Sequence, residues 1–351
     1  MRDNRTAERF RGAKGMDEAA RARLLAWLGA TFREPIVSAD LTRLSGGAIQ
    51  ENWGLTLNIA GAEPQELVLR RDAPATIRSS RSREDEFRLL GLMRRAGVRV
   101  PRPVALCTDP AVLGAPFFLM QRIPGVADPR RLVGDDDLVP DRPALGAALG
   151  AELARIHAIR PPQPDFGFLG PPPGDPARAR VEEYRATLDR LGAPQPAIEW
   201  VLRWLERNRP PPGPPSLLHG DYRIGNVMVA DGKIAALLDW EFCAWGDPDE
   251  DIGWFCARCW RFGRPEREAG GVAMRADFYR GYEAAAGRRI DAGQIPYWEA
   301  MAAIRWAIIA LEQGARYLAE PEPGLEAALS GRIAPQLVAE AMTVITGIDR
   351  A

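Results

Sequence analysis

The stretch LLHGDYRIGNVMVADGKIAALLDWEFCAW, residues 217–245, decides how the rest of the chain is interpreted. Its H-G-D motif ends at Asp221, Asn226 follows after four residues, and a second carboxylate, Asp239, follows an apolar run. The pair Asp231-Gly232 lies between two apolar segments, which is typical of a β-hairpin turn. The sequence therefore predicts a hairpin that brings Asn226 and Asp239 together.

These residue types in this order suit phosphoryl transfer. Asp221 is the candidate catalytic residue, because a carboxylate can orient a substrate hydroxyl and accept its proton. Asn226 and Asp239 are the candidate metal ligands, because Mg²⁺ prefers hard oxygen donors and keeps some of its waters. His219 is expected to shape the turn, with catalysis by His219 itself as the rival interpretation. The alternative is a surface hairpin whose Asp and Asn residues only make turns.

The order H-G-D-x4-N followed by D-W-E resembles the aminoglycoside phosphotransferase-like branch of the protein-kinase-like fold. Within that branch it is most similar to the phosphotransferase domains found alone or fused to acyl-CoA dehydrogenases. The resemblance covers roughly residues 35–320. It implies an α+β bilobal fold, with a small β-rich N-lobe over 17–122 and a larger helical C-lobe over 123–351. It also implies ATP, or GTP, and Mg²⁺ as cofactors. Residues 1–16 are polar, rich in arginine and without periodicity, so we expect them to form a flexible tail.

Upstream segments carry the expected nucleotide-binding residues. By resemblance, a strand, a turn at Gly46-Gly47 and a second strand over 51–59 would cover the triphosphate, since glycine lets the backbone approach phosphates closely. The alternative is an ordinary hairpin turn, because two adjacent glycines need no ligand. By resemblance, a cation at the end of the strand 65–70 holds the phosphates, and Arg70 stands there. Strand alternation puts Arg70 and Arg71 on opposite faces, so Arg71 is the rival.

The amphipathic helix expected over 82–96 supplies the partner of this cation. By resemblance, Glu86 pairs with Arg70, and Glu84 is the rival. The segment after the strand 115–120 contains proline and glycine and predicts a hinge. By resemblance, this hinge binds the nucleobase through main-chain groups near Gln121 and Ile123, which do not distinguish ATP from GTP.

Other patterns predict the remaining elements. Short strands are expected over 41–44 and 104–107, and helices over 18–32, 142–159, 177–191, 197–208, 274–286, 295–318 and 325–345. His157 is interpreted as a satisfied core or helix-end group. Asp247 or Asp251 would brace the catalytic loop, cap the next helix, or do both. The aromatic residues Trp254, Trp260, Tyr297, Trp298, Trp306 and Tyr317 are each interpreted as core.

Composition excludes several classes of partner. Apolar residues make up 46% and charged residues 26%, and the net charge of −1 provides no global field for nucleic acid or anionic membrane. No apolar run reaches the length needed to span a bilayer, and the first residues lack the apolar core of a secretory signal, so we expect a cytoplasmic protein. Cys256 and Cys259 are interpreted as apolar helix positions, not as a zinc pair. The oligomeric state is not indicated.

The sequence thus predicts a Mg²⁺-dependent kinase that transfers the γ-phosphoryl group of ATP or GTP to a small-molecule hydroxyl. A hydroxyacyl or other anionic or apolar acceptor is favoured, because arginines alternate with acids after residue 257 and do not suit a polycationic aminoglycoside. An aminoglycoside phosphotransferase is the first alternative. The second is a nucleotide-binding pseudokinase without turnover, since Arg70 stands where protein kinases have Lys. A Ser/Thr protein kinase is disfavoured because no A-P-E follows Asp239.

Overall fold

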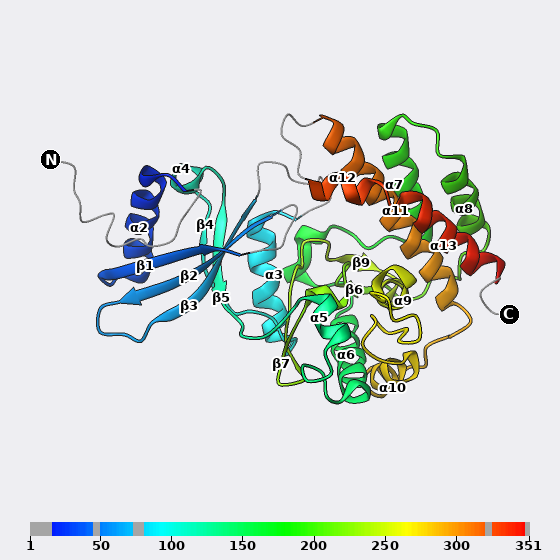
Figure 1. The fold of residues 1–351 in the computed structure, drawn as a ribbon, viewed down its shortest axis with the longest axis horizontal. Helices are drawn as coiled ribbons and strands as arrows, with labels where there is room; N and C mark the ends of the chain where they lie inside the picture. The colour runs from blue at the N-terminus through cyan, green and yellow to red at the C-terminus, as the bar shows by residue number, and fades with distance from the viewer. Residues whose placement is uncertain (1–15, 45–49, 73–80, 320–324, 348–351) are drawn as a thin grey trace. The chain divides into compact units, whose positions relative to one another are not determined.

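The computed structural model describes residues 16–44, 50–72, 81–319 and 325–347 (Figure 1). Nearly all of the predicted tail and the predicted Gly46-Gly47 turn lie outside these ranges. The chain divides into two compact units. The first contains the described residues up to Arg95 together with Val100–Pro124, and the second contains Ala96–Arg99 and the described residues from Gly125 onward. The fold is α+β, as predicted, with a sheet in the first unit and mainly helices in the second.

A single antiparallel sheet forms the framework of the first unit, with the strand order β1-β2-β3-β5-β4. The strands are β1 (Ile36–Arg43), β2 (Gln50–Ile59), β3 (Gln65–Asp72), β4 (Pro103–Cys107) and β5 (Phe117–Gln121). Strand β1 begins earlier than the predicted strand at 41–44. A β-bulge between Ile36 and Ser38 interrupts the alternation of apolar residues there, which hid the strand from a period-two pattern.

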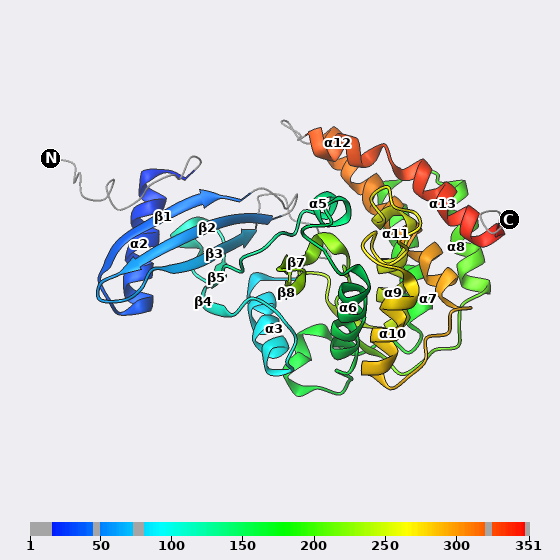
Figure 2. The same ribbon diagram turned by 60° about the horizontal axis from the view of Figure 1, so that its bottom comes forward.

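The helices of the first unit are α2 (Glu18–Phe32), α3 (Arg83–Arg95) and the short α4 (Pro110–Leu113) (Figures 1 and 2). Asp17 caps α2, as predicted, by accepting a hydrogen bond from the N–H of Ala20 at 2.6 Å. The buried side chains of α2 join the core on one face of the sheet. Helix α3 packs on the other face, where the rings of Phe87 and Phe118 lie 5.9 Å apart.

The second unit is built around the long helix α11 (Ile295–Ala319) (Figure 1). Its core joins α11 to α7 (Pro176–Leu191), α8 (Pro196–Arg207) and α13 (Ala334–Thr346). The other elements are α5 (Pro129–Gly134), α6 (Arg142–His157), η1 (Pro164–Leu169), β6 (Ser216–Leu218), η2 (Ile224–Asn226), β7 (Val227–Ala230), β8 (Lys233–Leu237), β9 (Ala244–Gly246), α9 (Pro248–Cys256), η3 (Arg258–Trp260), α10 (Arg275–Ala286) and α12 (Leu325–Gly331).

Helices α6 and α10 approach each other at glycines. A Cβ atom at Gly281 would lie 1.9 Å from the carbonyl oxygen of Ala147, and one at Gly150 would lie 2.0 Å from that of Phe278. Neither backbone could move away without displacing its helix. This close crossing brings the C-terminal end of α6, which carries His157, next to α10.

Two predictions about helices in the second unit were wrong in detail. The helix predicted over 325–345 is divided, because α12 ends at Gly331 and α13 begins at Ala334 with Pro335 in its first turn. A Cβ at Gly331 would lie 2.7 Å from the Cα of Gly314 in α11, so this close approach also requires glycine. Helix α9 ends at Cys256, so Cys259 lies in the following 3-10 turn. Both thiols are free, and burial raises the pKa of Cys256 to about 12.

No helix within the described ranges combines the length and the hydropathy that a bilayer-spanning segment requires.

Candidate active site

The loop that carries the H-G-D motif begins at the end of β6. Strand β6 pairs with β9, and Leu217 is opposite Trp245. Gly220 follows with a positive φ of 78°, and a Cβ atom there would lie 2.2 Å from the carbonyl oxygen of Phe242. Only glycine therefore fits at this position, both in backbone conformation and in space. The loop is held tightly against the segment that follows Asp239.

Asp251, at the start of α9, holds this loop from behind. Its carboxylate accepts hydrogen bonds from the N–H groups of His219 at 2.7 Å and Gly220 at 3.0 Å. Burial opposes the charged form of Asp251, but the hydrogen bonds from His157 and His219 outweigh it and lower the pKa of this carboxyl. Asp251 thus braces the loop and Asp247 caps the helix by accepting from the N–H of Asp249. Bracing the loop and capping the helix are therefore the roles of two different residues.

A chain of buried polar groups supports Asp251 in turn. His157 lies 3.3 Å from Asp251 through Nε2 and 2.9 Å from the Tyr282 hydroxyl through Nδ1. Arg288 donates to the same hydroxyl at 2.8 Å and to Asp249 at 2.6 Å. His157 is therefore a satisfied core group, as predicted, and it connects the loop of the H-G-D motif to α10.

His219 connects the two halves of the candidate site. Its Nε2 lies 3.0 Å from the carbonyl oxygen of Leu238, and its Nδ1 accepts from the N–H of Asp221 at 3.2 Å. Burial lowers the pKa of His219, so the ring is neutral and donates through Nε2. Both ring nitrogens are used by the backbone. This geometry supports the structural interpretation of His219, which ties Asp221 to the residue before Asp239.

Asp221 is partly exposed, with 13% of its side chain accessible. Its Oδ2 accepts from Asn226 Nδ2 at 2.6 Å, and its Oδ1 accepts from the indole Nε1 of Trp254 at 2.9 Å. Arg223 contacts both carboxylate oxygens through Nε, at 3.1 and 3.3 Å. The Arg223 contacts are the longest of the set, so they are the ones that an incoming hydroxyl would most easily replace.

Asn226 and Asp239 lie at the two ends of the predicted hairpin. Strands β7 and β8 pair in antiparallel fashion around Asp231 and Gly232, both with positive φ. Beyond the hairpin, the N–H of Leu238 donates to the carbonyl oxygen of Asn226 at 2.8 Å. Because Asp239 directly follows Leu238, this bond keeps the backbone of Asp239 close to that of Asn226. Asp239 has a positive φ of 57° and a partly buried side chain. The sequence-predicted neighbourhood of Asn226 and Asp239 is therefore present in the backbone.

The side-chain oxygen of Asn226 is suited to a metal ion. Both donors on Nδ2 face Asp221, one bond going to its carboxylate and one to its main-chain carbonyl at 2.9 Å. The amide is thereby oriented, and Oδ1 is buried with no hydrogen-bond donor among the residues that the structure describes. A buried acceptor without a donor is costly, and a hard cation would satisfy it.

The predicted phosphate-binding residues of the first unit form a separate cluster. Arg70, buried on the α3 face of β3, contacts Glu86 through Nε at 3.1 Å and lies 3.5 Å from Oδ1 of Asn52. Arg83 also contacts the carboxylate of Glu86 and pairs with Asp72 at 2.9 Å. Glu86, not Glu84, is therefore the partner of Arg70. Asn52 and Arg83 were not foreseen from the sequence.

The structure also gives the contacts of Arg71, the rival cation, and of the predicted hinge residues. Arg71 lies on the opposite face, where it pairs with Glu51 at 2.7 Å and donates to the carbonyl oxygen of Leu113 at 2.8 Å. The N–H of Gln121 donates to Arg102 in the sheet, so it is not available to a base. Ile123 forms no backbone hydrogen bond within the described residues. Nucleobase binding at Gln121 and Ile123 stays a prediction, as does phosphate binding by Gly46 and Gly47, outside the described residues.

Known proteins resemble this chain along most of its length. A match to the APH phosphotransferase enzyme family extends over residues 40–302. The chain belongs to this family. The match confirms the family predicted from the H-G-D-x4-N and D-W-E motifs, so the protein is a phosphotransferase with a hydroxyl group as acceptor.

One curated relative of this phosphotransferase is acyl-CoA dehydrogenase family member 10 of Mus musculus, which is 33% identical over 201 residues. The match covers 55% of the chain but only 18% of that relative. A solved structure of a candidate aminoglycoside phosphotransferase from Ralstonia eutropha is 22% identical, with a TM-score of 0.73 and coverage of 93% and 98% of the two chains. The GDP and kanamycin complex of APH(2'')-IIIa is 16% identical, with a TM-score of 0.58 and coverage of 91% and 98%.

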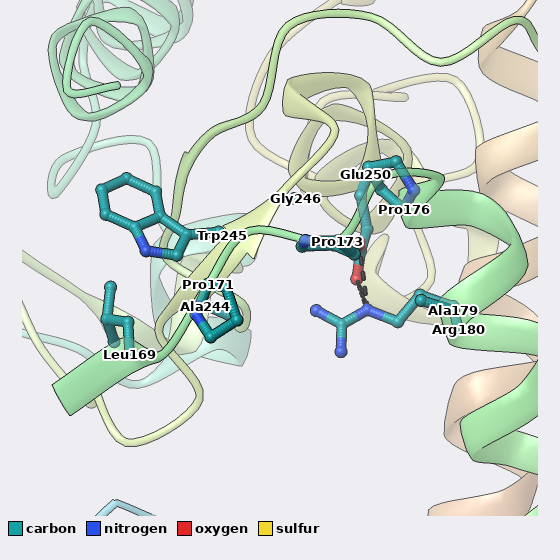
Figure 3. Close-up of a pocket in the computed structure, with 10 residues that line it drawn as sticks. All are labelled: Leu169, Pro171, Pro173, Pro176, Ala179, Arg180, Ala244, Trp245, Gly246 and Glu250. Carbon is teal, nitrogen blue, oxygen red and sulfur yellow. Dashed lines mark hydrogen bonds and ion pairs between the residues drawn. The ribbon is translucent and has the colours of Figure 1, made fainter. Parts of the chain in front are cut away.

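A cavity of about 180 Å³ lies in the second unit of the phosphotransferase, away from the contacts of Asp221 described above (Figure 3). Prolines 171, 173 and 176 and Trp245 contribute apolar surface to its lining, and polar groups contribute about as much. Its polar wall is an ion pair in which Arg180 Nε lies 2.9 Å from Glu250. Because these charges satisfy each other, the cavity does not require a charged ligand.

Two contacts of Asp221 were missed from the sequence. Trp254 was interpreted as core, and it is buried, but its indole N–H is aimed at the carboxylate. Arg223 lies within the motif, and its charge two residues after Asp221 was a usable signal. Trp254 gave no such signal, because an indole in an apolar helix pattern shows nothing about where its N–H will point.

Proposed function

We propose that this phosphotransferase transfers the γ-phosphoryl group of ATP or GTP to a hydroxyl of a small molecule in a Mg²⁺-dependent reaction. The observation that carries the proposal is the arrangement of Asp221 and Asn226. The amide donors of Asn226 fix the Asp221 carboxylate, while the amide oxygen is left without a donor among the described residues. A hairpin that only made turns would not require such an oriented, buried oxygen.

The roles of the residues follow from their chemistry. Asp221 orients the acceptor hydroxyl and takes its proton as the oxygen bonds to the γ-phosphorus and the bond to the β-phosphate oxygen breaks. Asn226 and Asp239 would hold Mg²⁺, which when bound neutralises charge on the phosphates. Arg223, fixed between Asp221 and the ring of Trp260 at 5.2 Å, supplies a positive charge beside the transferred group.

The cluster in the first unit is assigned to the nucleotide. Arg70 contacts the α- and β-phosphates, and Glu86 fixes its rotamer from the buried side. Guanidinium suits this role, because it stays charged when buried and makes bidentate contacts with phosphate. Gly46 and Gly47 cover the phosphates, and the main chain near Gln121 and Ile123 binds the base. A GDP complex is known for a solved structure with the same fold, which supports a purine nucleotide.

The acceptor is proposed to be a hydroxyacyl or another anionic or apolar hydroxyl compound. Three curated relatives that are 27–33% identical are named as acyl-CoA dehydrogenase family members, and this chain covers less than a third of each. That likeness supports an acyl-related acceptor. The matched structure with kanamycin has only 16% identity and supports the fold alone.

A screen for acceptor-stimulated ADP release tests the proposal. Wild type and Asp221→Asn are assayed with ATP and GTP against hydroxylated metabolites, hydroxyacyl-CoA esters and aminoglycosides, with and without Mg²⁺. The proposal expects at least one acceptor to stimulate wild type in a Mg²⁺-dependent way and to leave Asp221→Asn near background. Equal, negligible release from both proteins, with nucleotide binding intact, would instead identify a nucleotide-binding protein without turnover.

A further inference from the structure

Arg305 differs from the other arginines around the candidate active site. It lies on α11, partly exposed, and within the part of the chain that the structure describes no carboxylate pairs with it. The neighbouring arginines are paired: Arg180 with Glu250, Arg223 with Asp221, Arg275 with Glu299 and Arg288 with Asp249. A partly buried cation without a counter-charge is costly unless it binds something.

The position of Arg305 relates it directly to Asp221. Its guanidinium carbon lies 4.4 Å from the centroid of the Trp254 ring and 5.8 Å from that of Phe242. The same indole donates its N–H to Asp221 at 2.9 Å. A single indole ring therefore separates the guanidinium from the candidate catalytic carboxylate. Cation–π contacts with two rings hold the guanidinium in place without using its N–H donors.

None of the groups that face Arg305 neutralises it. On its own helix, the positions three and four residues away are Met301, Ala302, Ile308 and Ile309. On α7, the Tyr184 hydroxyl is close enough to be affected by the charge of Arg305, and it is buried without a hydrogen-bond partner in the described structure. Burial raises the pKa of Tyr184, and the charge of Arg305 acts against that rise. Three carboxylates of this neighbourhood already have a cation: Glu183 and Glu250 are held by Arg180, and Asp221 is held by Arg223.

We propose that Arg305 is a specificity-determining residue that binds an anionic group of the acceptor. The acceptor is then a hydroxyl compound with a carboxylate or phosphate close to the reacting oxygen, and polycationic acceptors are repelled by the same charge. The inference rests on the proposed function, because it takes Asp221 as the group that orients the acceptor hydroxyl. Arg305 is then the residue that recognises the acceptor, and the acceptor must carry a negative charge.

Steady-state kinetics with matched acceptors test the inference. Each hydroxy acid is compared with its carboxamide, which has nearly the same shape and no charge, in wild type, Arg305→Gln and Arg305→Lys. Arg289→Gln removes one positive charge at a side chain that is 91% exposed and serves as the control. Wild type should prefer the acids, and Arg305→Gln should raise KM for the acids roughly tenfold to a hundredfold, the range of one charge-assisted contact, with kcat and amide turnover unchanged. Arg305→Lys should recover part of the loss.

A binding measurement separates failure of the inference from failure of the proposed function. Propionate and propionamide, which have no hydroxyl, are titrated into wild type while the side-chain Nε–H resonance of Arg305 is followed by NMR, with Arg305→Lys identifying that resonance. Propionate should shift it, and propionamide and the resonance of Arg289 should respond much less. Equal responses to the two probes, or equal KM changes for acids and amides, overturn the inference. Absence of turnover in wild type overturns only the proposed function, since the titration still decides the role of Arg305.

Discussion

The two groups of candidate site residues reach their positions in different ways. Asp221, Asn226 and Asp239 lie in one short stretch, and a glycine turn and a hairpin bring them together through backbone hydrogen bonds. Arg70 and Glu86 come from a strand and a helix, and they meet only because α3 packs on one face of the sheet. Residue spacing can therefore reveal a site built from neighbouring residues, whereas an ion pair between two packed elements can be identified only from the tertiary structure.

The local site also depends on distant residues. Asp251 holds the loop backbone, and Trp254 holds the carboxylate of Asp221, both from α9. In the first unit, Arg83 and Asp72 complete the packed cluster around Glu86. We therefore expect substitutions in the local site to change turnover, and substitutions that remove the buried charge of Glu86 to change stability as well as the proposed nucleotide binding.

The largest effect is expected at Asp221. Asp221→Asn keeps the shape but removes the charge that orients and deprotonates the acceptor, so turnover should fall roughly 10²–10⁴-fold. It is measured as ADP release with an acceptor from the screen, and nucleotide binding by calorimetry serves as the control. A loss of turnover below about tenfold, with nucleotide binding unchanged, would show that Asp221 does not act as the general base.

Glu86 offers the corresponding test in the packed cluster. Glu86→Ala leaves the buried cations Arg70 and Arg83 facing each other, so the free energy of unfolding should fall by about 3–5 kcal/mol. Glu84→Ala, in the same first turn of α3, should change it by about 0.5 kcal/mol or less. Urea denaturation measures both. Similar losses in the two variants would mean that the cluster does not act as a buried ion pair.

Asn226 tests whether the local site is a metal site. Asn226→Ala removes the buried Oδ1, and the Mg²⁺ concentration for half-maximal activity should rise roughly tenfold to a hundredfold, the scale seen when a metal site loses a supporting group. The control is Asn208→Ala, which changes an exposed amide at the end of α8. An unchanged Mg²⁺ requirement in Asn226→Ala, with reduced turnover, would assign Asn226 to holding Asp221 only.

The smallest effect concerns pH. The folded pKa of His219 is lowered by burial, so below about pH 6.5 the unfolded state binds a proton that the folded state does not. His219 therefore lowers the free energy of unfolding as pH falls, by up to about 1.4 kcal/mol per pH unit. In His219→Asn this slope should disappear. Urea denaturation between about pH 5 and 7, within the range of histidine titration, measures the difference between the two proteins.

The comparison with His219→Asn is needed because another group titrates in this range. Burial raises the pKa of Asp247 to about 6, so Asp247 favours the folded state as pH falls, with the opposite sign. Both proteins contain Asp247, and its effect cancels in the difference between their slopes. Equal slopes in wild type and variant would show that His219 is not held neutral in the folded state.

Much of the architecture could be predicted from the sequence. Helix α2 spans Glu18–Phe32 as predicted, because Asp17 gives a clear start signal and Leu24 and Leu28 mark its buried face. Strand β1 was foreshortened and the helix over 325–345 was not seen to break, because a bulge and a glycine contact leave no periodic signal. In the site, Glu86 could be named only with Glu84 as a rival, since a pattern of acids on a helix does not show which one is buried.

The sequence by itself determined the phosphotransferase family, the hairpin and the order of Asp221, Asn226 and Asp239, because turns and strand periods act between neighbours in the chain. Only the tertiary structure decided which side chains complete that site. The indole of Trp254 and the carboxylate of Asp251 reach it from α9. A hydrogen bond or a ring contact depends on direction and distance, and for residues far apart in the chain these exist only once the helices have packed.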